Sequence, residues 1–315
     1  MTTEQPTSTT HANPASLAGP ANPTHPTHPT QHPAHSTRSA HLADEILLLA
    51  ATGKTGRRLV ARLRAEGRTV RAASRSGDTR FDWTEPASWP AATKGAKAVY
   101  LVAPEDPAPV ADFVAQATAA GVARFVVLSG RGMDHVSAEF GAGMIAAERA
   151  VRESGAQWSI IRANNFDQNF TEDLWREPLR SGRLALPIGA TPEPFVDVED
   201  VAEVAAALLT RDGHTGRVVD VSGPEALTFG AAVETIARAS GRSIRYVELT
   251  SEEYEAELVA EGWRPADAAG IGAMFTTMRA GHLAAPADGV RRVLGREATD
   301  FTTFAIRAAA AGAWA

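Results

Sequence analysis

The sequence predicts an α/β fold with a doubly wound parallel sheet and a smaller C-terminal lobe. Two observations lead to this prediction. Apolar, strand-like runs alternate with helical segments from about residue 44 onward, and a glycine-bearing turn joins the first strand to the first helix. A chain of 315 residues, 44% of them hydrophobic, can form one large domain with an added lobe. We therefore divide the chain into a Thr/Pro/His-rich tail (1–43), the domain that contains the sheet (44–222), and a lobe packed on that domain (223–315).

Composition excludes several classes of protein. A net charge of -6 and a pI near 5.9 argue against a nucleic-acid partner. No apolar run approaches the ~18 residues that a membrane span needs. The chain has no cysteine, which excludes disulfides and thiolate metal sites and fits a cytoplasmic protein. The tail has too few large apolar groups for a core, so we expect it to be disordered; its histidines could bind a metal loosely, but a solvated tail fits better.

The first predicted strand, helix and connecting turn form the most informative stretch. An apolar run over 46–51 predicts a buried strand, and apolar residues on one face predict a helix over 57–67. Between them, two glycines let the backbone approach a phosphate, and the amides that open the helix point toward that anion. Ala50 stands where a three-glycine fingerprint has its first glycine, so a plain strand-to-helix turn is the alternative. The expected pyrophosphate seat consists of Thr52, Gly53, Lys54, Thr55 and Gly56.

Further strands and helices alternate along the chain. We predict strands over 69–74, around 81, and over 98–102, 124–129, 158–162 and 217–221, with helices between them. The helix over 109–120 has apolar residues at helical spacing and ends at Gly121. In such a sheet, ligands bind at the carboxyl ends of the strands.

The end of the second strand indicates which dinucleotide is bound. About 20 residues after the glycine turn, an acidic residue would bind the ribose hydroxyls of NAD. The chain has Ser74, Arg75 and Ser76 there instead, and a guanidinium flanked by hydroxyls suits a 2′-phosphate. We therefore expect NADP(H) in preference to NAD(H). The alternative for Arg75 is an exposed arginine without a ligand. Lys54 or Arg57 could contribute to the same pocket, although either could equally be a solvated charge on the helix.

The sequence resembles the NmrA-like group of atypical short-chain dehydrogenases/reductases. The resemblance rests on the turn over 51–56, the Phe-Asp-Trp run at 81–83, the strand over 125–129 and the segment 194–202, and it covers nearly everything after residue 43. Bacterial relatives of ergot-alkaloid iminium reductases and of type 2 quinone oxidoreductases are the most similar members. The resemblance implies a further set of cofactor-binding residues: Asp82 at the adenine, Trp83 beside it, and Val102, Ala103 and Pro104 along the path from ribose to nicotinamide.

The chain departs from the wider superfamily at the residues that deliver a proton. Members that reduce carbonyls use a Tyr-x-x-x-Lys pair, and alignment places Phe140 and Met144 at those positions. Neither side chain can donate a proton. The superfamily's catalytic serine would correspond to Ser129 or to its neighbour Gly130. Hydride acceptors that need no acid, such as an iminium or a quinone, therefore suit the chain better than a ketone, and the two substituted residues either line an apolar pocket or pack within the fold.

The segment 162–170 is the expected other side of that pocket. Carboxamides that directly follow a parallel strand lie at the ligand end of the sheet, unless they only satisfy their own turn. Asn164 is our second catalytic candidate beside Ser129. Four other residues complete the expected substrate contacts: His135, Asn165, Phe166 and Phe170.

The remainder predicts a small α/β lobe without a metal site. Thr228 should cap a helix that ends near Gly241, an edge strand should follow over 244–249, and Ser251 should open a further helix. The apolar segment 263–283 could close over the substrate, but packing in the core fits its methionines better. The sequence offers no second and third metal ligand beside His135 or His282, so we do not expect a metal there. Asp197 and Asp200 fit a structural role at a helix start better than a catalytic one.

Three functions remain open at this stage. The first, which we rank highest, is an NADPH-dependent reductase of a small molecule such as a cyclic iminium or a quinone. The second is a non-catalytic NADP(H) sensor that binds a partner protein, and the third is a non-redox cyclase or isomerase on the same scaffold. The sequence leaves a monomer and a homodimer equally open.

Overall fold

The computed structural model describes residues 45–133 and 141–315, which belong to one compact unit. The expected tail over 1–43 and the expected contacts His135 and Phe140 lie outside the described residues.

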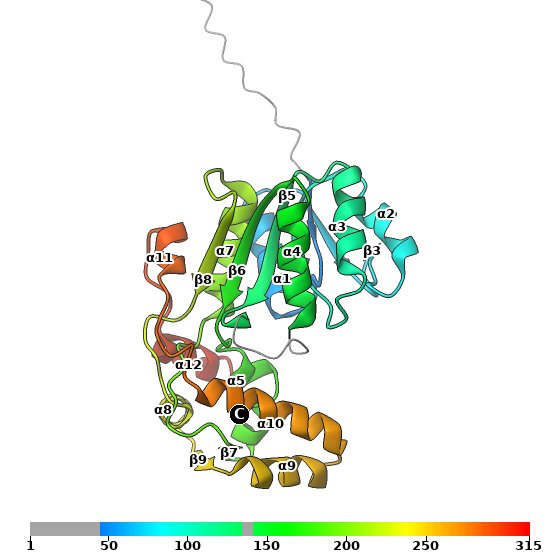
Figure 1. Cartoon of the computed structure of the whole chain (residues 1–315). Coiled ribbons are helices and arrows are strands. Elements are labelled where there is room, and N and C mark those ends of the chain that lie inside the picture. The colour runs from blue at the N-terminus through cyan, green and yellow to red at the C-terminus, as the bar shows by residue number, and fades with distance from the viewer. Residues whose placement is uncertain (1–44, 134–140) are drawn as a thin grey trace, which may run out of the picture. The chain divides into compact units, whose positions relative to one another are not determined.

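The main sheet has seven strands, all parallel, in the order β3-β2-β1-β4-β5-β6-β8 (Figure 1). Chain order reverses between β1 and its neighbour β4, and the glycine turn directly follows β1 at this switch point. The doubly wound parallel sheet predicted from the sequence is therefore confirmed. The strands are β1 (Glu45–Leu48), β2 (Val70–Ser74), β3 (Thr79–Arg80), β4 (Ala96–Val102), β5 (Arg124–Gly130), β6 (Gln157–Ala163) and β8 (Arg217–Val221).

Helices cover both faces of the sheet, because alternate residues of the strands bury apolar side chains on opposite sides (Figure 1). One face carries α1 (Lys54–Ala65), α7 (Val198–Thr210) and α11 (Gly289–Leu294). The other carries α2 (Trp89–Thr93), which follows the 3-10 turn η1 (Pro86–Ser88), α3 (Val110–Ala119) and α4 (Ala142–Glu153).

The lobe has its own core and a second sheet of two parallel strands. Its elements are α5 (Asn169–Glu172), α6 (Arg176–Arg180), β7 (Arg183–Leu186), α8 (Phe229–Ser240), β9 (Arg245–Glu248), α9 (Ser251–Ala260), α10 (Pro265–Arg279) and α12 (Phe301–Ala310). As predicted, Thr228 caps α8, Gly241 ends it with a φ of 66°, and α9 begins at Ser251. A capping box at Thr250, which was not predicted, starts α9. The predicted edge strand is β9, but its partner β7 was not predicted.

The division at residue 222 differs in detail from the structure. The segment from α5 to β7 packs in the lobe although it precedes residue 222, and α11 returns to pack on α7 and β8. Phe170 belongs to the lobe core, where its fully buried ring contacts those of Trp175, Phe195 and Phe301. Phe170 is thus a residue of the lobe core, in contrast to its expected contact with substrate, because its ring is buried among other aromatic rings.

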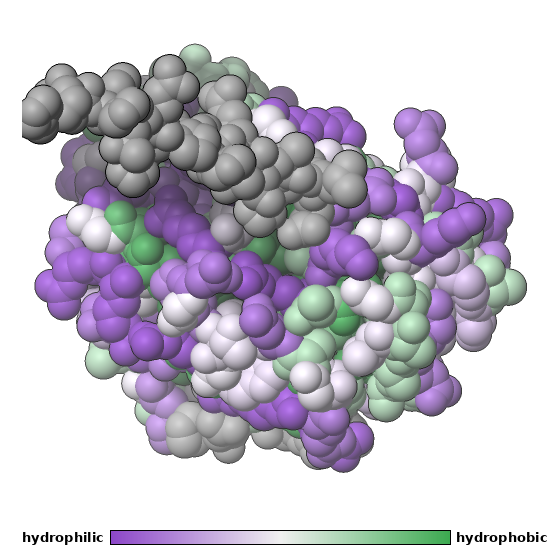
Figure 2. Space-filling model, turned by 90° about the horizontal axis from the view of Figure 1, so that it is seen from above, coloured by the Kyte–Doolittle hydropathy of each residue, from purple (hydrophilic) through white to green (hydrophobic). Residues whose placement is uncertain are grey.

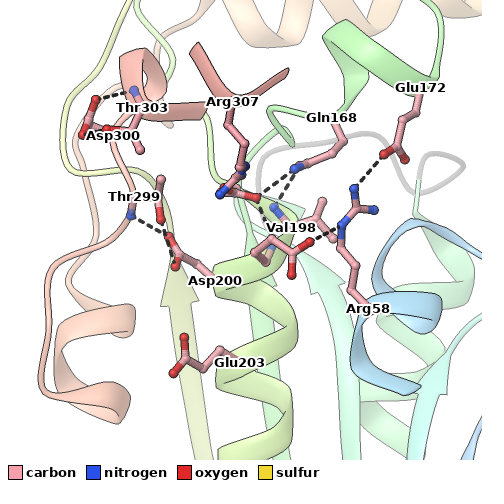
Figure 3. Close-up of polar contacts among 12 residues, drawn as sticks. Arg58, Gln168, Glu172, Val198, Asp200, Glu203, Thr299, Asp300, Thr303 and Arg307 are labelled. Atoms are coloured by element: carbon pink, nitrogen blue, oxygen red, sulfur yellow. Dashed lines mark hydrogen bonds and ion pairs between the residues drawn. The ribbon is translucent and has the colours of Figure 1, made fainter. Parts of the chain in front are cut away.

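Polar contacts join the start of α7 to the lobe (Figure 3). The carboxylate of Asp197 caps α7 by accepting from the amide of Glu199 at 2.9 Å, and it also accepts from Gln168 at 2.8 Å and from Arg307 of α12. Asp200 accepts from the backbone amide of Thr299 at 2.6 Å. The structural interpretation of the two aspartates is confirmed.

The surface shown in Figure 2 is mainly hydrophilic, with hydrophobic residues in small separate patches. Within residues 45–133 and 141–315, no helix is both long enough and apolar enough to cross a membrane.

Candidate active site

The glycine turn has the backbone geometry of an anion cradle. Ala50 adopts a left-handed conformation with a φ of 51°, and Gly53 forms the N-cap of α1. A Cβ added to Gly56 would lie 2.1 Å from the carbonyl oxygen of Ala50, closer than any side chain can approach. The helix start can lie this close to the turn only because Gly56 has no side chain, so its free amides face the position of a phosphate. The turn therefore fits a dinucleotide pyrophosphate.

The end of β2 presents the predicted 2′-phosphate residues. Ser74 is the last residue of β2, and Arg75 and Ser76 follow it as exposed residues. Asp82 lies near enough for Arg75 to influence it: hydrogen bonds from Thr84 lower the pKa of this carboxyl most, and the charge of Arg75 lowers it further. The arginine and Asp82 thus share one end of the expected cofactor groove.

The other expected cofactor residues lie around the ends of β3 and β4. The ring of Trp83 packs edge-on against those of Phe81 and Phe113, with centroids 5.1 Å apart in both pairs. Val102 ends β4, and Ala103 and Pro104 follow it. A Cβ on Gly143 of α4 would lie 1.7 Å from the carbonyl oxygen of Pro104, so α4 packs directly on this loop.

A cavity of about 700 Å³ opens at the carboxyl ends of β5 and β6. Its lining extends from Lys54, at the start of α1, to α10 in the lobe. Of the sequence-predicted residues, the structure brings together in its wall Lys54, Gly130, Met144, Asn164, Asn165 and Phe166. The remaining wall is mostly apolar and includes Met133, Met274, Met278 and Leu283. Its volume and lining are typical of a small-molecule site.

Helix α10 contributes both to the cavity and to the lobe core. Its two methionines line the cavity and also pack against the lobe core, in which Phe275 of the same helix is buried. The expectation that these methionines pack in the core is therefore met only in part. His282 also lines the cavity. Within the described part of the chain, no cluster of three His, Cys, Asp or Glu residues could hold a metal.

Ser129 does not line the cavity. Its buried hydroxyl donates to the Oε1 atom of Glu148 on α4 at 2.7 Å, and the same carboxylate accepts from Arg162 and Arg152. Burial tends to raise the pKa of Glu148, but the hydrogen bonds from Arg162 and Ser129 outweigh burial and lower it. The geometry of Ser129 is that of a residue that joins β5 to α4, in contrast to its expected catalytic role.

Asn164 belongs to a polar network that sequence reasoning missed in part. Its Oδ1 atom accepts from the Nη1 atom of Arg131 at 3.0 Å, and its Nδ2 atom donates to Glu193 at 2.8 Å. Burial raises the pKa of Glu193, although hydrogen bonds from Asn164 and Asn165 and the charge of Arg131 oppose that increase. Arg131 follows a predicted strand end and could have been found by the same rule as Arg75. Glu193 lies in a loop without any motif.

Lys54 is held on the cavity side of the glycine turn. Its ammonium group donates to Asn169 at 2.6 Å and to Asp173 at 2.5 Å. Arg57 pairs with Glu172. The observed partners of both cations are therefore residues of the lobe segment that contains α5.

Comparisons with known proteins identify the family of this chain. Residues 50–212 match a family model described as NAD(P)H-binding. The chain is 30% identical to the NAD(P)H azoreductase of Xenophilus azovorans, over 86% of this chain and 95% of the relative. It is 32% identical to the (4-alkanoyl-5-oxo-2,5-dihydrofuran-3-yl)methyl phosphate reductase of Streptomyces griseus, over 81% and 95%. The NADPH-dependent quinone oxidoreductase of Escherichia coli, solved with NADPH, has a similar fold, with a TM-score of 0.69, 18% identity, and coverage of 84% of this chain and 99% of that chain. The chain belongs to the NAD(P)H-binding, NmrA-like family of oxidoreductases.

Proposed function

We propose that the protein is an NADPH-dependent reductase that transfers hydride to an activated small-molecule acceptor, such as a cyclic iminium or a quinone, without a Tyr/Lys dyad. The observation that carries this proposal is the largely apolar cavity between the glycine turn and α10, with Met144 in its wall where the dyad lysine would be. The activities of the relatives, which reduce azo, furanone phosphate and quinone compounds, support a conjugated acceptor.

The residues that would hold the cofactor run along the carboxyl edge of the sheet. The turn over 52–56 would bind the pyrophosphate, Arg75 with Ser74 and Ser76 would bind a 2′-phosphate, and the segments 82–83 and 102–104 would flank the adenosine and ribose. When bound, the cofactor supplies hydride from its nicotinamide ring.

The chain itself contributes positioning and water exclusion. Four methionines and Phe166 give the cavity an adaptable apolar wall, and the network of Arg131, Asn164 and Glu193 fixes one polar edge. An acceptor that is already activated needs little more than this orientation. Gly130, Asn165 and Met144 are the proposed acceptor contacts among the sequence-predicted residues, beside Phe166. A cytoplasmic location with access to NADPH completes the proposal.

The decisive experiment measures NADPH oxidation by the purified protein with a panel of quinones and cyclic imines, together with NADPH binding on the same sample. We expect acceptor-dependent oxidation that disappears in the Gly53→Val variant, whereas an Arg68→Met variant on the exposed end of the first βαβ unit keeps it. Tight binding without turnover would favour a sensor. No binding of either cofactor would leave only a non-redox function.

A second experiment tests the missing dyad. The double variant with Phe140→Tyr and Met144→Lys should not raise turnover of the native acceptor, because that acceptor needs no acid. A clear gain in turnover would contradict reduction without a proton donor.

A further inference from the structure

Arg131 differs in its partners from the other charged residues of the cavity wall. Lys54 and Asp173 form an ion pair, so their charges offset one another. Arg131 uses only its Nη1 atom in its side-chain hydrogen bonds to residues in the described ranges, to Asn164 Oδ1 at 3.0 Å and to the carbonyl oxygen of Ala285 at 2.6 Å. Both acceptors are neutral, and none of the ion pairs within those ranges includes this arginine.

The position of the guanidinium is fixed from several sides. The backbone amide of Arg131 donates to Ala163 at the end of β6, which anchors the residue at the carboxyl edge of the sheet. Asn164 is itself held by Glu193, and Ala285 lies in the segment that follows α10. One nitrogen of the forked guanidinium group, Nη1, is therefore bound to the protein. Its Nε and Nη2 atoms have no hydrogen bond to any described residue, in a cavity whose wall is otherwise mainly apolar.

Glu193, with 4% of its surface exposed, is the acidic group that faces Arg131 across Asn164. Burial raises the pKa of its carboxyl, and the charge of Arg131 opposes that increase. Arg131 thus brings to the cavity wall a positive charge that has no direct ion-pair partner among the described residues. A cationic acceptor would meet repulsion there, whereas a carbonyl oxygen or an anion would be attracted.

We propose that Arg131 determines the acceptor class, so that the enzyme reduces conjugated carbonyl compounds, such as quinones and unsaturated lactones, rather than preformed iminium cations. This inference rests on the proposed reductase function and narrows its substrate. Hydride addition brings two electrons to a carbon of the conjugated system, breaks a π bond, and moves an electron pair onto the carbonyl oxygen. The free side of the Arg131 fork binds that oxygen and stabilises the oxyanion, and solvent then protonates it.

The test compares Arg131→Met, which removes the charge, and Arg131→Lys, which keeps the charge without the fork. Arg149→Met is the control, since Arg149 is exposed on α4. Two acceptors are assayed with NADPH: 1,4-naphthoquinone and the N-methyl-3,4-dihydroisoquinolinium cation. Binding of lawsone (2-hydroxy-1,4-naphthoquinone), which is an anion at neutral pH, is measured by calorimetry without turnover.

We expect the wild type to prefer the naphthoquinone. Arg131→Met should lower kcat/KM for it by about 100-fold, the usual effect of losing one oxyanion donor, without lowering that for the cation. The same variant should weaken lawsone binding by at least about 10-fold, with Arg131→Lys between it and the wild type. The dissociation constant for NADPH should stay within about threefold.

Equal losses for both acceptors, unchanged lawsone binding, or weakened NADPH binding would each overturn the role of Arg131. A wild type that binds lawsone through Arg131 but oxidises no NADPH would instead contradict the proposed reductase function. The two failures are thus distinguishable.

Discussion

The carbonyl oxygen of Ala50 lies 2.1 Å from the point that a Cβ of Gly56 would occupy, and 3.2 Å from the corresponding point on Gly53. One backbone oxygen therefore limits the space for a side chain at both glycines of the turn, and it does so much more severely at Gly56 than at Gly53.

Gly56→Ala should displace the start of α1 and impair both stability and cofactor binding. We expect a loss of about 1–3 kcal/mol in the free energy of unfolding, as for overpacked cores, and at least about a 10-fold weaker NADPH affinity. Urea denaturation and fluorescence titration measure the two quantities. Gly53→Ala is the matched control and should change both much less; similar losses in the two variants would contradict the contact argument.

Ala50→Gly should stabilise the protein. Ala50 has a φ of 51°, a conformation that costs an L-residue about 1–2 kcal/mol, and glycine removes this cost at the expense of about 0.5–1 kcal/mol of chain entropy. A net gain of up to about 1 kcal/mol is expected in urea denaturation. Ala61→Gly, at an exposed position inside α1, should instead lose about 1 kcal/mol. If Ala50→Gly lowered the free energy of unfolding as much as Ala61→Gly does, backbone strain at Ala50 would be contradicted.

Arg75→Ala should weaken NADPH binding by about 10- to 100-fold, because a charged hydrogen-bond partner of the 2′-phosphate is lost. NADH, which lacks that phosphate, should bind almost unchanged. Titration of each cofactor checks the difference, and Arg80→Ala, which removes an exposed pair with Glu85, is the control. Equal losses for the two cofactors would remove Arg75 from the 2′-phosphate site.

Asp167→Asn should make stability less dependent on pH. Asp167 is fully buried, and neither of its carboxyl oxygens has a hydrogen-bond partner in the described chain. Burial, and after it the charge of Asp197, raise its pKa well above the ordinary value. Its contribution to stability is therefore complete below the unfolded-state pKa of about 4 and is lost as the pH rises through the folded-state pKa. Between pH 4 and pH 8, the free energy of unfolding of the variant should therefore increase relative to that of the wild type.

Urea denaturation at several pH values tests the sign of that effect. Asp300→Asn serves as the opposite case, because the backbone amide of Thr303 lowers the pKa of Asp300 most. Its carboxylate stabilises the fold above the unfolded-state pKa, and this contribution is lost as the pH falls through the folded-state value. Parallel pH profiles for the two variants would contradict both assignments.

Ser129→Ala should lower stability by about 1 kcal/mol or more while turnover of the folded enzyme stays within a fewfold of the wild type, because the hydroxyl donates to buried Glu148. Thermal denaturation and kcat measured on the same preparation separate the two effects. A loss of kcat of about 100-fold or more, the scale of acid–base catalysis, would restore the serine as a catalytic residue.

Local signals in the sequence were sufficient for the main sheet and the glycine turn. Strands such as β4 and β5 are buried on both faces, so their apolar runs are visible without knowledge of the fold, and the caps at Thr228 and Gly241 depend only on neighbouring residues. The parallel pairing of β7 with β9 was not predictable, because it joins segments about 60 residues apart and neither has a distinctive pattern.

Site residues were predictable where their position at the end of a strand determines their location. They were not predictable where tertiary packing determines it. Asn164 and Asn165 follow a strand end and line the cavity, as expected. Phe170 follows in the same segment, but it packs among aromatic rings that come from distant parts of the chain. The hydrogen bond of Ser129 was not predictable for a similar reason, since its partner Glu148 lies on a different element.

Lys54 is the first residue of the helix that follows the glycine turn, and it also lies in the wall of the cavity. This position has a thermodynamic consequence. Its ammonium group is bound to Asn169 and Asp173, so a ligand on either side that shifts Lys54 also changes the surroundings of the other. Any such influence is reciprocal: if the nucleotide changes the affinity for the acceptor by some factor, the acceptor changes the affinity for the nucleotide by the same factor. Lys54 would thereby link the two proposed binding equilibria.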